Sequence, residues 1–110
     1  MNKEKAYYDL LELFSRMTDP QLQRKANKDS QAKRKLGRDM MLIGANIALF
    51  GSDEVVHLYI DWRASTLTGD AEKMLFVFSQ LILAMRTDLT PTTKISDSAI
   101  MTECFVSLEG

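Results

Sequence analysis

Residues 74–89, MLFVFSQLILAMRTDL, constrain the fold more than any other part of the chain. Apolar side chains occupy nearly every angular position of a helix here, and only Ser79 and Gln80 interrupt them before the polar end of the segment. A helix that is apolar on all sides must be covered on all sides. The segment therefore predicts a central core helix, with the rest of the chain as its cover, rather than a functional site.

Other segments show the three- and four-residue spacing of apolar residues that is typical of amphipathic helices. They span residues 3–17, 20–50 and 53–64, and a short last helix follows with Ser96 or Asp97 as its cap. No segment alternates in the manner of a strand. We therefore predict an all-α fold, an up-and-down bundle of four main helices plus a short C-terminal helix.

The spacing also predicts which side chains point inward in the first and third helices. In the first helix these are Tyr7, Leu10, Leu11, Phe14 and Met17. In the third they are Val55, Val56, Tyr59, Ile60 and Trp62.

Proline, glycine and capping residues mark the predicted helix boundaries. Pro20 suits the first turn of a helix, and either Thr18 or Asp19 can cap it. Gly51 is expected to end the second helix in a left-handed conformation, with Ser52 capping the third.

Residues 27–35, NKDSQAKRK, are almost free of apolar side chains. They either continue the second helix as a solvated segment or break it into a loop. We predict one continuous helix over residues 20–50, because no proline follows the first position and the helical period resumes beyond the polar stretch.

Length and composition favour one domain over residues 1–110, since the chain has 45% hydrophobic and 26% charged residues. The single cysteine, Cys104, excludes an internal disulfide and suggests a cytoplasmic location. No signal peptide is expected. The most apolar run, residues 40–50, is far shorter than the roughly 20 residues that cross a bilayer, so we predict no transmembrane segment.

Two short segments, GSDEVV at residues 51–56 and AMRTDL at residues 84–89, resemble segments of a group of uncharacterised bacterial helical-bundle proteins. The resemblance covers about residues 40–105. It implies a helical bundle and a bacterial source, and it implies no activity. This chain has Thr90 and Pro91 where the turn in that group commonly contains glycine, and it lacks the N-terminal membrane segment that members often carry.

Charges beside the predicted core are candidates for structural ion pairs. A hairpin of the third and fourth helices should bring Arg86 and Asp88 close to Asp53. An arginine in a last helical turn and an acid in a first turn also suit the helix dipoles. We predict structural pairing, with ligand binding as the alternative.

A basic segment lies between residues 20 and 39, with seven basic and two acidic side chains and hence a local net charge of +5. Such a cluster can bind phosphate groups. It lacks the aromatic residues that stack on bases, so a solvated helix face is the favoured interpretation. The possible anion-binding surface comprises Arg24, Lys25, Lys28, Lys33, Arg34, Lys35 and Arg38.

No catalytic, cofactor-binding or metal-binding motif is recognisable in the sequence. His57 has no partner at metal-ligand spacing and is expected at the surface, and Cys104 is expected as an inert buried thiol. We predict a non-enzymatic protein-interaction or assembly module, with a homodimer as one form of assembly. The alternative is a small nucleic-acid or phosphate-binding protein that uses the basic segment.

Overall fold

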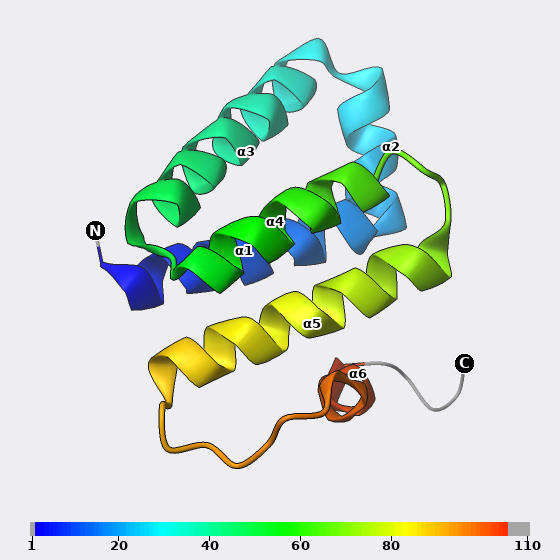
Figure 1. The fold of residues 1–110 in the computed structure, drawn as a ribbon. Coiled ribbons are helices and arrows are strands. Elements are labelled where there is room, and N and C mark those ends of the chain that lie inside the picture. Colours follow the sequence, from blue (N-terminus) through cyan, green and yellow to red (C-terminus); the bar gives the residue numbers. More distant parts are fainter. Residues whose placement is uncertain (1, 106–110) are drawn as a thin grey trace. The chain divides into compact units, whose positions relative to one another are not determined.

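The computed structural model describes residues 2–105, apart from the side chains of residues 23 and 26. Every regular element within this range is a helix, which confirms the all-α helical bundle. The helices in chain order are α1 (Lys3–Thr18), α2 (Pro20–Lys28), α3 (Ser30–Phe50), α4 (Asp53–Ser65), α5 (Ala71–Leu89) and α6 (Ser98–Phe105) (Figure 1).

The chain divides into two compact units, and the boundary in the sequence falls between Gly51 and Ser52. The first unit contains α1, α2 and α3, and the second contains α4, α5 and α6. The prediction of one domain over residues 1–110 stays a prediction.

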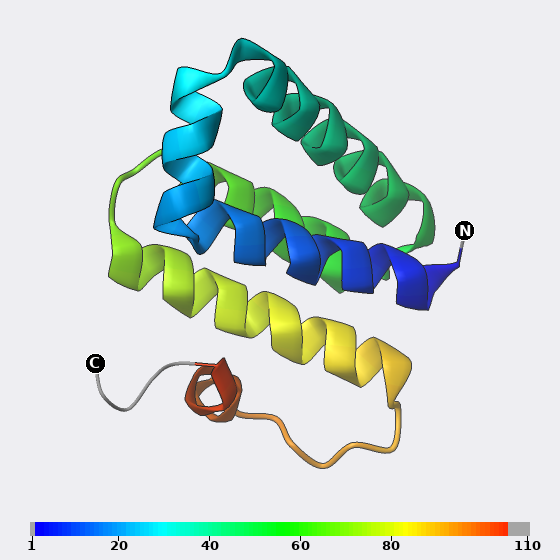
Figure 2. The same ribbon diagram turned by 180° about the vertical axis from the view of Figure 1, so that it is seen from behind.

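In the first unit, each helix packs against the other two. Figure 2 shows α1 and α3 running in opposite directions, with the short α2 crossing between their ends. Each helix is amphipathic in sequence, and burial of the apolar faces holds the three together. The buried apolar residues of this unit are Ala6, Tyr7, Leu10, Leu13, Ile43 and Ile47.

The predicted continuous helix over residues 20–50 is wrong, because the chain breaks at Asp29. The backbone of Asp29 is extended, and its carboxylate accepts a hydrogen bond of 2.9 Å from the Gln31 amide. Its own amide donates to the Lys25 carbonyl at 2.9 Å, so one residue closes α2 and opens α3. The polar stretch is therefore neither a long solvated helix nor a loop, but two helices joined by a capping aspartate.

The other helix boundaries agree only in part with those predicted from the sequence. Asp19, rather than Thr18, caps α2 by accepting a hydrogen bond from the Gln21 amide at 2.9 Å. Ser52 caps α4 as predicted. The left-handed ending predicted for Gly51 is wrong, because this residue is extended with φ of −73° and ψ of 152°.

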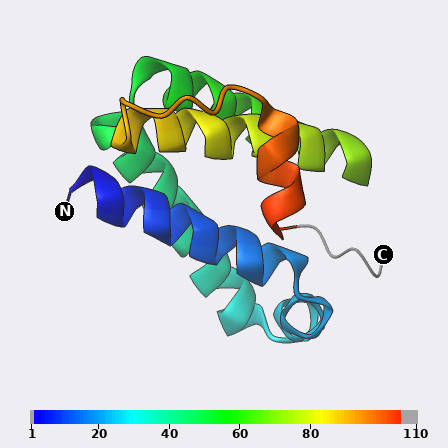
Figure 3. The ribbon, with the colours of Figure 1, turned by 90° about the horizontal axis from the view of Figure 1, so that it is seen from below.

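In the second unit, α4 and α5 form an antiparallel hairpin and α6 crosses α5 steeply (Figure 3). The helix caps are Asp70 for α5 and Asp97 for the start of α6. The turn into α5 uses Gly69 with φ of 72°, a conformation that glycine adopts without a steric penalty. The buried apolar residues are Val55, Tyr59, Trp62, Val77, Phe78, Leu81, Ala84, Met85 and Met101.

Several side chains predicted to be inward are exposed. Leu11 on α1 and Ile60 on α4 face solvent, and Leu13 takes the buried position on α1 instead. On α5, Phe76 is 59% exposed, so this helix is not covered on all sides as predicted. Within the second unit it packs against only α4 and α6, and two helices cannot cover its whole circumference.

Candidate functional site

In the first unit, one face of α3 exposes several large apolar side chains. Met41, Leu42 and Leu49 are 67%, 53% and 75% exposed, and Ala45 and Ala48 between them are also exposed. The spacing of three and four residues places all five on one side of the helix, which we call the α3 stripe. The opposite side of α3 carries the buried Ile43 and Ile47.

The two ends of the α3 stripe differ in charge. Arg34 and Arg38 are exposed and continue the stripe toward the N-terminus of the helix, because they precede Met41 at helical spacing. The last turn of α3 carries no basic residue, so its carbonyl end is not neutralised by a side chain of the helix. The surface is therefore basic at one end, apolar in the middle and partially negative at the other end.

An ion-pair cluster joins α1 to α3 beside this face. Arg16 Nη1 on α1 lies 3.0 Å from Asp39 Oδ2 on α3, and Lys35 Nζ lies 3.5 Å from the same oxygen. These groups line a hollow of 290 Å³ together with Asp9 and Glu12. The cluster links α1 to α3 and places two cationic side chains and one carboxylate in the lining of this hollow, beside the apolar Leu42 and Ile43.

The hydrogen bond from Arg16 lowers the pKa of the Asp39 carboxyl below its ordinary value of 3.8, and the nearby charge of Lys35 acts in the same direction against the effect of burial. A carboxyl with a depressed folded-state pKa stabilises the fold fully above its unfolded pKa, and this contribution is lost as pH falls through the folded pKa. The stabilisation by Asp39 should therefore be complete at neutral pH, begin to decline below about pH 4, and be lost as the pH falls through the lowered pKa of the folded state.

Asp39→Asn should lower the free energy of unfolding at pH 7 by about 0.5 to 1 kcal/mol, the range for partly exposed ion pairs. Chemical denaturation at pH 7 and pH 3 measures the difference, which should be smaller at the lower pH, because protonation of Asp39 removes the ion pair. Asp61→Asn, at an exposed position on α4, serves as the control and should change neither value. An equal loss of stability at both pH values would contradict the ion-pair role.

The seven basic residues of the anion-binding candidate all lie exposed on α2 and α3. Lys35 is engaged by Asp39, whereas Arg34 and Arg38 line an open hollow of 490 Å³ with Gln31. The cluster is accessible to solvent, and its positions agree with a solvated helix face as well as with an anion-binding surface.

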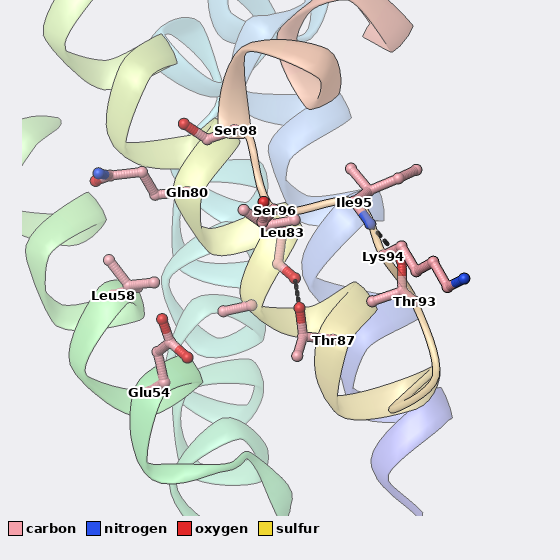
Figure 4. A pocket seen from close by; sticks show the side chains of 11 residues that line it. Glu54, Leu58, Gln80, Leu83, Thr87, Thr93, Lys94, Ile95, Ser96 and Ser98 are labelled. Atoms are coloured by element: carbon pink, nitrogen blue, oxygen red, sulfur yellow. Dashed lines mark hydrogen bonds between the residues drawn. The ribbon is translucent and has the colours of Figure 1, made fainter.

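A third hollow, of 430 Å³, lies in the second unit between α4, α5 and the segment that follows α5 (Figure 4). Glu54 and Leu58 line the side formed by α4, and Thr87 lines the side formed by α5. Lys94 belongs to the segment that follows α5 and forms the remaining side. The Thr87 hydroxyl donates to the Leu83 carbonyl at 2.9 Å. The hollow is shallow and mixed in character, with one acidic and one basic side chain at its rim.

The hairpin geometry expected for the ion-pair candidates is present, since Glu54 near the start of α4 and Thr87 near the end of α5 line the same hollow. Arg86 Nε, in the last turn of α5, donates to Thr93 Oγ1 at 3.1 Å and so ties α5 to the segment that follows it. The ion pairing of Arg86 and Asp88 with Asp53 stays a prediction.

The histidine and the cysteine are both at the surface. His57 is exposed on α4, as predicted. Cys104 is also exposed, so the predicted buried thiol is wrong, because it lies on the solvent side of the short α6 while Met101 faces inward. Across residues 2–105, no group of three or more His, Cys, Asp and Glu side chains is placed to hold a metal ion.

Comparisons of the chain with models of protein families, with curated proteins and with solved structures gave no match. In the part of the chain that the structure describes, none of the helices has the length and apolar character needed to cross a membrane.

Sequence reasoning missed both the α3 stripe and the Asp39 cluster. The stripe has a signal in the sequence, since residues 34, 38, 41, 45 and 48 repeat at alternating intervals of four and three, the spacing of a helix-pairing seam. The cluster has no such signal, because Arg16 and Asp39 are 23 positions apart and meet only after α1 and α3 pack.

Proposed function

We propose that this protein is a non-enzymatic assembly module that associates with a second copy of itself through the α3 stripe. The observation that carries the proposal is the exposure of Met41, Leu42 and Leu49 on one helix face, with the exposed Ala45 and Ala48 between them. Single exposed apolar residues are ordinary, whereas a contiguous group of large ones on a rigid helix is typical of interaction surfaces.

Burial of this face would be favourable because apolar surface removed from water contributes about 25 cal/mol per Å². The backbone of α3 is already helical and packed on α1 and α2, so association does not have to order the segment first. A preformed helix face is the form in which many helical proteins recognise each other.

The proposal includes a cytoplasmic location and a bacterial source for the protein. The single cysteine supports a reducing cytoplasm, and the GSDEVV-like and AMRxDL-like segments support a bacterial protein.

Leu49→Lys should weaken self-association at least tenfold, because it replaces the most exposed apolar side chain of the α3 stripe with a charge that must be desolvated in the contact. Sedimentation equilibrium of the wild-type chain between about 5 and 500 μM should show the average mass rising toward that of a dimer. The variant should stay a monomer over most of this range.

Leu67→Lys is the matched control, since Leu67 is 88% exposed in the turn between α4 and α5 and lies outside the stripe. It should dimerise as the wild type does. A wild-type chain that is monomeric at every concentration, or a control that dissociates as readily as Leu49→Lys, would contradict the proposal.

A second candidate function is the binding of nucleic acid or another polyphosphate by the basic segment, which the exposure of all seven basic side chains keeps accessible. The cluster lacks interleaved aromatic residues, and the remainder of the chain is acidic, which would repel a long polyanion. We therefore rank this function below self-association.

The wild-type chain should show no submicromolar binding to duplex DNA or single-stranded RNA at about 150 mM salt. Lys33→Glu combined with Arg34→Glu should leave helix content and thermal stability nearly unchanged, because both positions are exposed. A fluorescence-anisotropy titration measures the binding. Submicromolar affinity that falls steeply with salt and disappears in the charge-reversed variant would favour nucleic-acid binding over self-association as the function.

A further inference from the structure

We infer that two copies of the chain pair through α3 in antiparallel orientation, about a two-fold axis that passes beside Ala45. This inference rests on the proposed function and adds the orientation and register of the contact. Three features of α3 carry it: the spacing of the stripe, the order of large and small side chains, and the opposite charge of its two ends.

The spacing defines a seam along α3. Arg34, Arg38, Met41, Ala45 and Ala48 follow one another at intervals of four, three, four and three residues, and all are exposed. Side chains at this interval stay on the side of a helix that faces a partner helix. The seam is about 20 Å long at 1.5 Å per residue, and no other helix of the first unit occupies it.

The order of side-chain sizes fits an antiparallel partner in one register. With the axis at Ala45, Met41 lies opposite the partner's Leu49, and Leu42 lies opposite the partner's Ala48. Ala45 then faces its own copy, where two small side chains let the helices approach closely. Each large side chain therefore packs either on another flexible apolar chain or into the space above an alanine, and no polar side chain lies between them.

The charges decide between the two orientations. A parallel pair would place Arg34 and Arg38 beside the same two residues of the partner, with both helix N-termini at that end, and like charges would repel. An antiparallel pair places Arg38 beside the carbonyl end of the partner helix, where no basic residue lies in the last turn. Cations are favourable at a helix C-terminus, so the antiparallel pair is complementary in charge.

The size of the seam sets the expected strength. A stable dimer commonly buries about 800 Å² on each partner, and a seam of four helical turns lies at the small end of this range. We therefore expect a weak, reversible dimer with a dissociation constant of about 10 to 100 μM.

Disulfide trapping tests the orientation and the register together. In the full chain with Cys104→Ser, Ala45→Cys should form an intermolecular disulfide under mild oxidation, because the two positions face each other within the reach of a disulfide. Met41→Cys should not cross-link with itself, since its two copies would lie about 12 Å apart along the seam. An equal mixture of the Met41→Cys and Leu49→Cys chains should cross-link, whereas Leu49→Cys alone should not.

The outcomes separate this inference from the proposed function. Cross-linking of Met41→Cys and Leu49→Cys each with itself would indicate a parallel pair, and concentration-dependent dimers without any of these cross-links would place the interface elsewhere. Either result overturns the inference while self-association stands. A chain that stays monomeric overturns both. If that monomer co-sediments with phosphatidylcholine vesicles containing phosphatidylglycerol, and Leu49→Lys abolishes this, the stripe is a lipid-binding surface instead.

Discussion

Phe78→Ala should lower the free energy of unfolding by about 3 to 5 kcal/mol, the range for removing a buried aromatic side chain. Phe78 is 2% exposed on α5, and its ring lies 5.6 Å from that of Trp62 and 5.7 Å from that of Phe105. The substitution therefore leaves a cavity in the centre of the second unit and removes aromatic contacts with α4 and α6. Chemical denaturation followed by the fluorescence of Trp62, the single tryptophan, measures the loss.

Phe76→Ala is the matched control, with the same substitution two positions away on the same helix. Phe76 is 59% exposed, so its removal should cost less than about 1 kcal/mol. Equal destabilisation by the two substitutions would mean that α5 is covered on all sides, as its sequence alone suggests, and would contradict the exposure of Phe76.

Ile47→Ala should lower the free energy of unfolding by about 2 to 5 kcal/mol, because Ile47 is fully buried on the face of α3 that packs within the first unit. The expected loss is a large fraction of the 5 to 15 kcal/mol that stabilises an ordinary domain. Thermal and chemical denaturation followed by far-ultraviolet circular dichroism at about 5 μM, where a weak dimer is dissociated, measure this loss.

Leu49→Ala, two positions away on the exposed side of α3, is the control. It should leave the stability of the monomer within about 0.5 kcal/mol of the wild type and weaken only the dimer. If Leu49→Ala were as destabilising as Ile47→Ala, the stripe would belong to the core of the fold rather than to an interface.

The helices themselves were predictable from the sequence because their signals are local. Apolar periodicity located all the main segments, and Ser52 and Asp70 are capping residues whose function depends on neighbours three positions away. The break at Asp29 was missed because the same residue types occur in solvated helices. An aspartate there can stay on a helix surface or turn back to the Gln31 amide, and only the packing of α2 and α3 against each other and against α1 selects the second arrangement.

The burial of individual side chains was less predictable than the helices themselves, because burial depends on how many neighbouring helices surround a given helix. The helical period of α1 allows either Leu11 or Leu13 to be buried beside Leu10. The packing of α2 and α3 against α1 buries Leu13 and leaves Leu11 exposed. On α6, the eight-residue length leaves room for one fully buried apolar side chain, Met101, and turns Cys104 outward.

The sequence indicates the candidate site as an abundance of apolar residues at positions 40–50 and 74–85, which is more than a few short helices can cover. That excess is present, since the stripe lies within residues 30–50 and Phe76 is exposed on α5. The spacing of residues 34–48 marks a possible contact face on α3, but it does not decide which face is exposed, because both faces of this helix carry large apolar side chains. The packing of α1 and α2 leaves the face with Met41 and Leu49 exposed and buries the face with Ile43 and Ile47.

The central claim is that the α3 stripe is the surface through which two copies meet. The most direct test compares ¹H–¹⁵N correlation spectra of the wild-type chain at about 20 and 500 μM, a range that spans the expected dissociation constant. We expect concentration-dependent shifts of the amide signals of Met41, Ala45 and Leu49, with those of Leu67 and Phe76 unchanged. Spectra that are identical at both concentrations, or shifts that are centred on α4 to α6, would contradict this account.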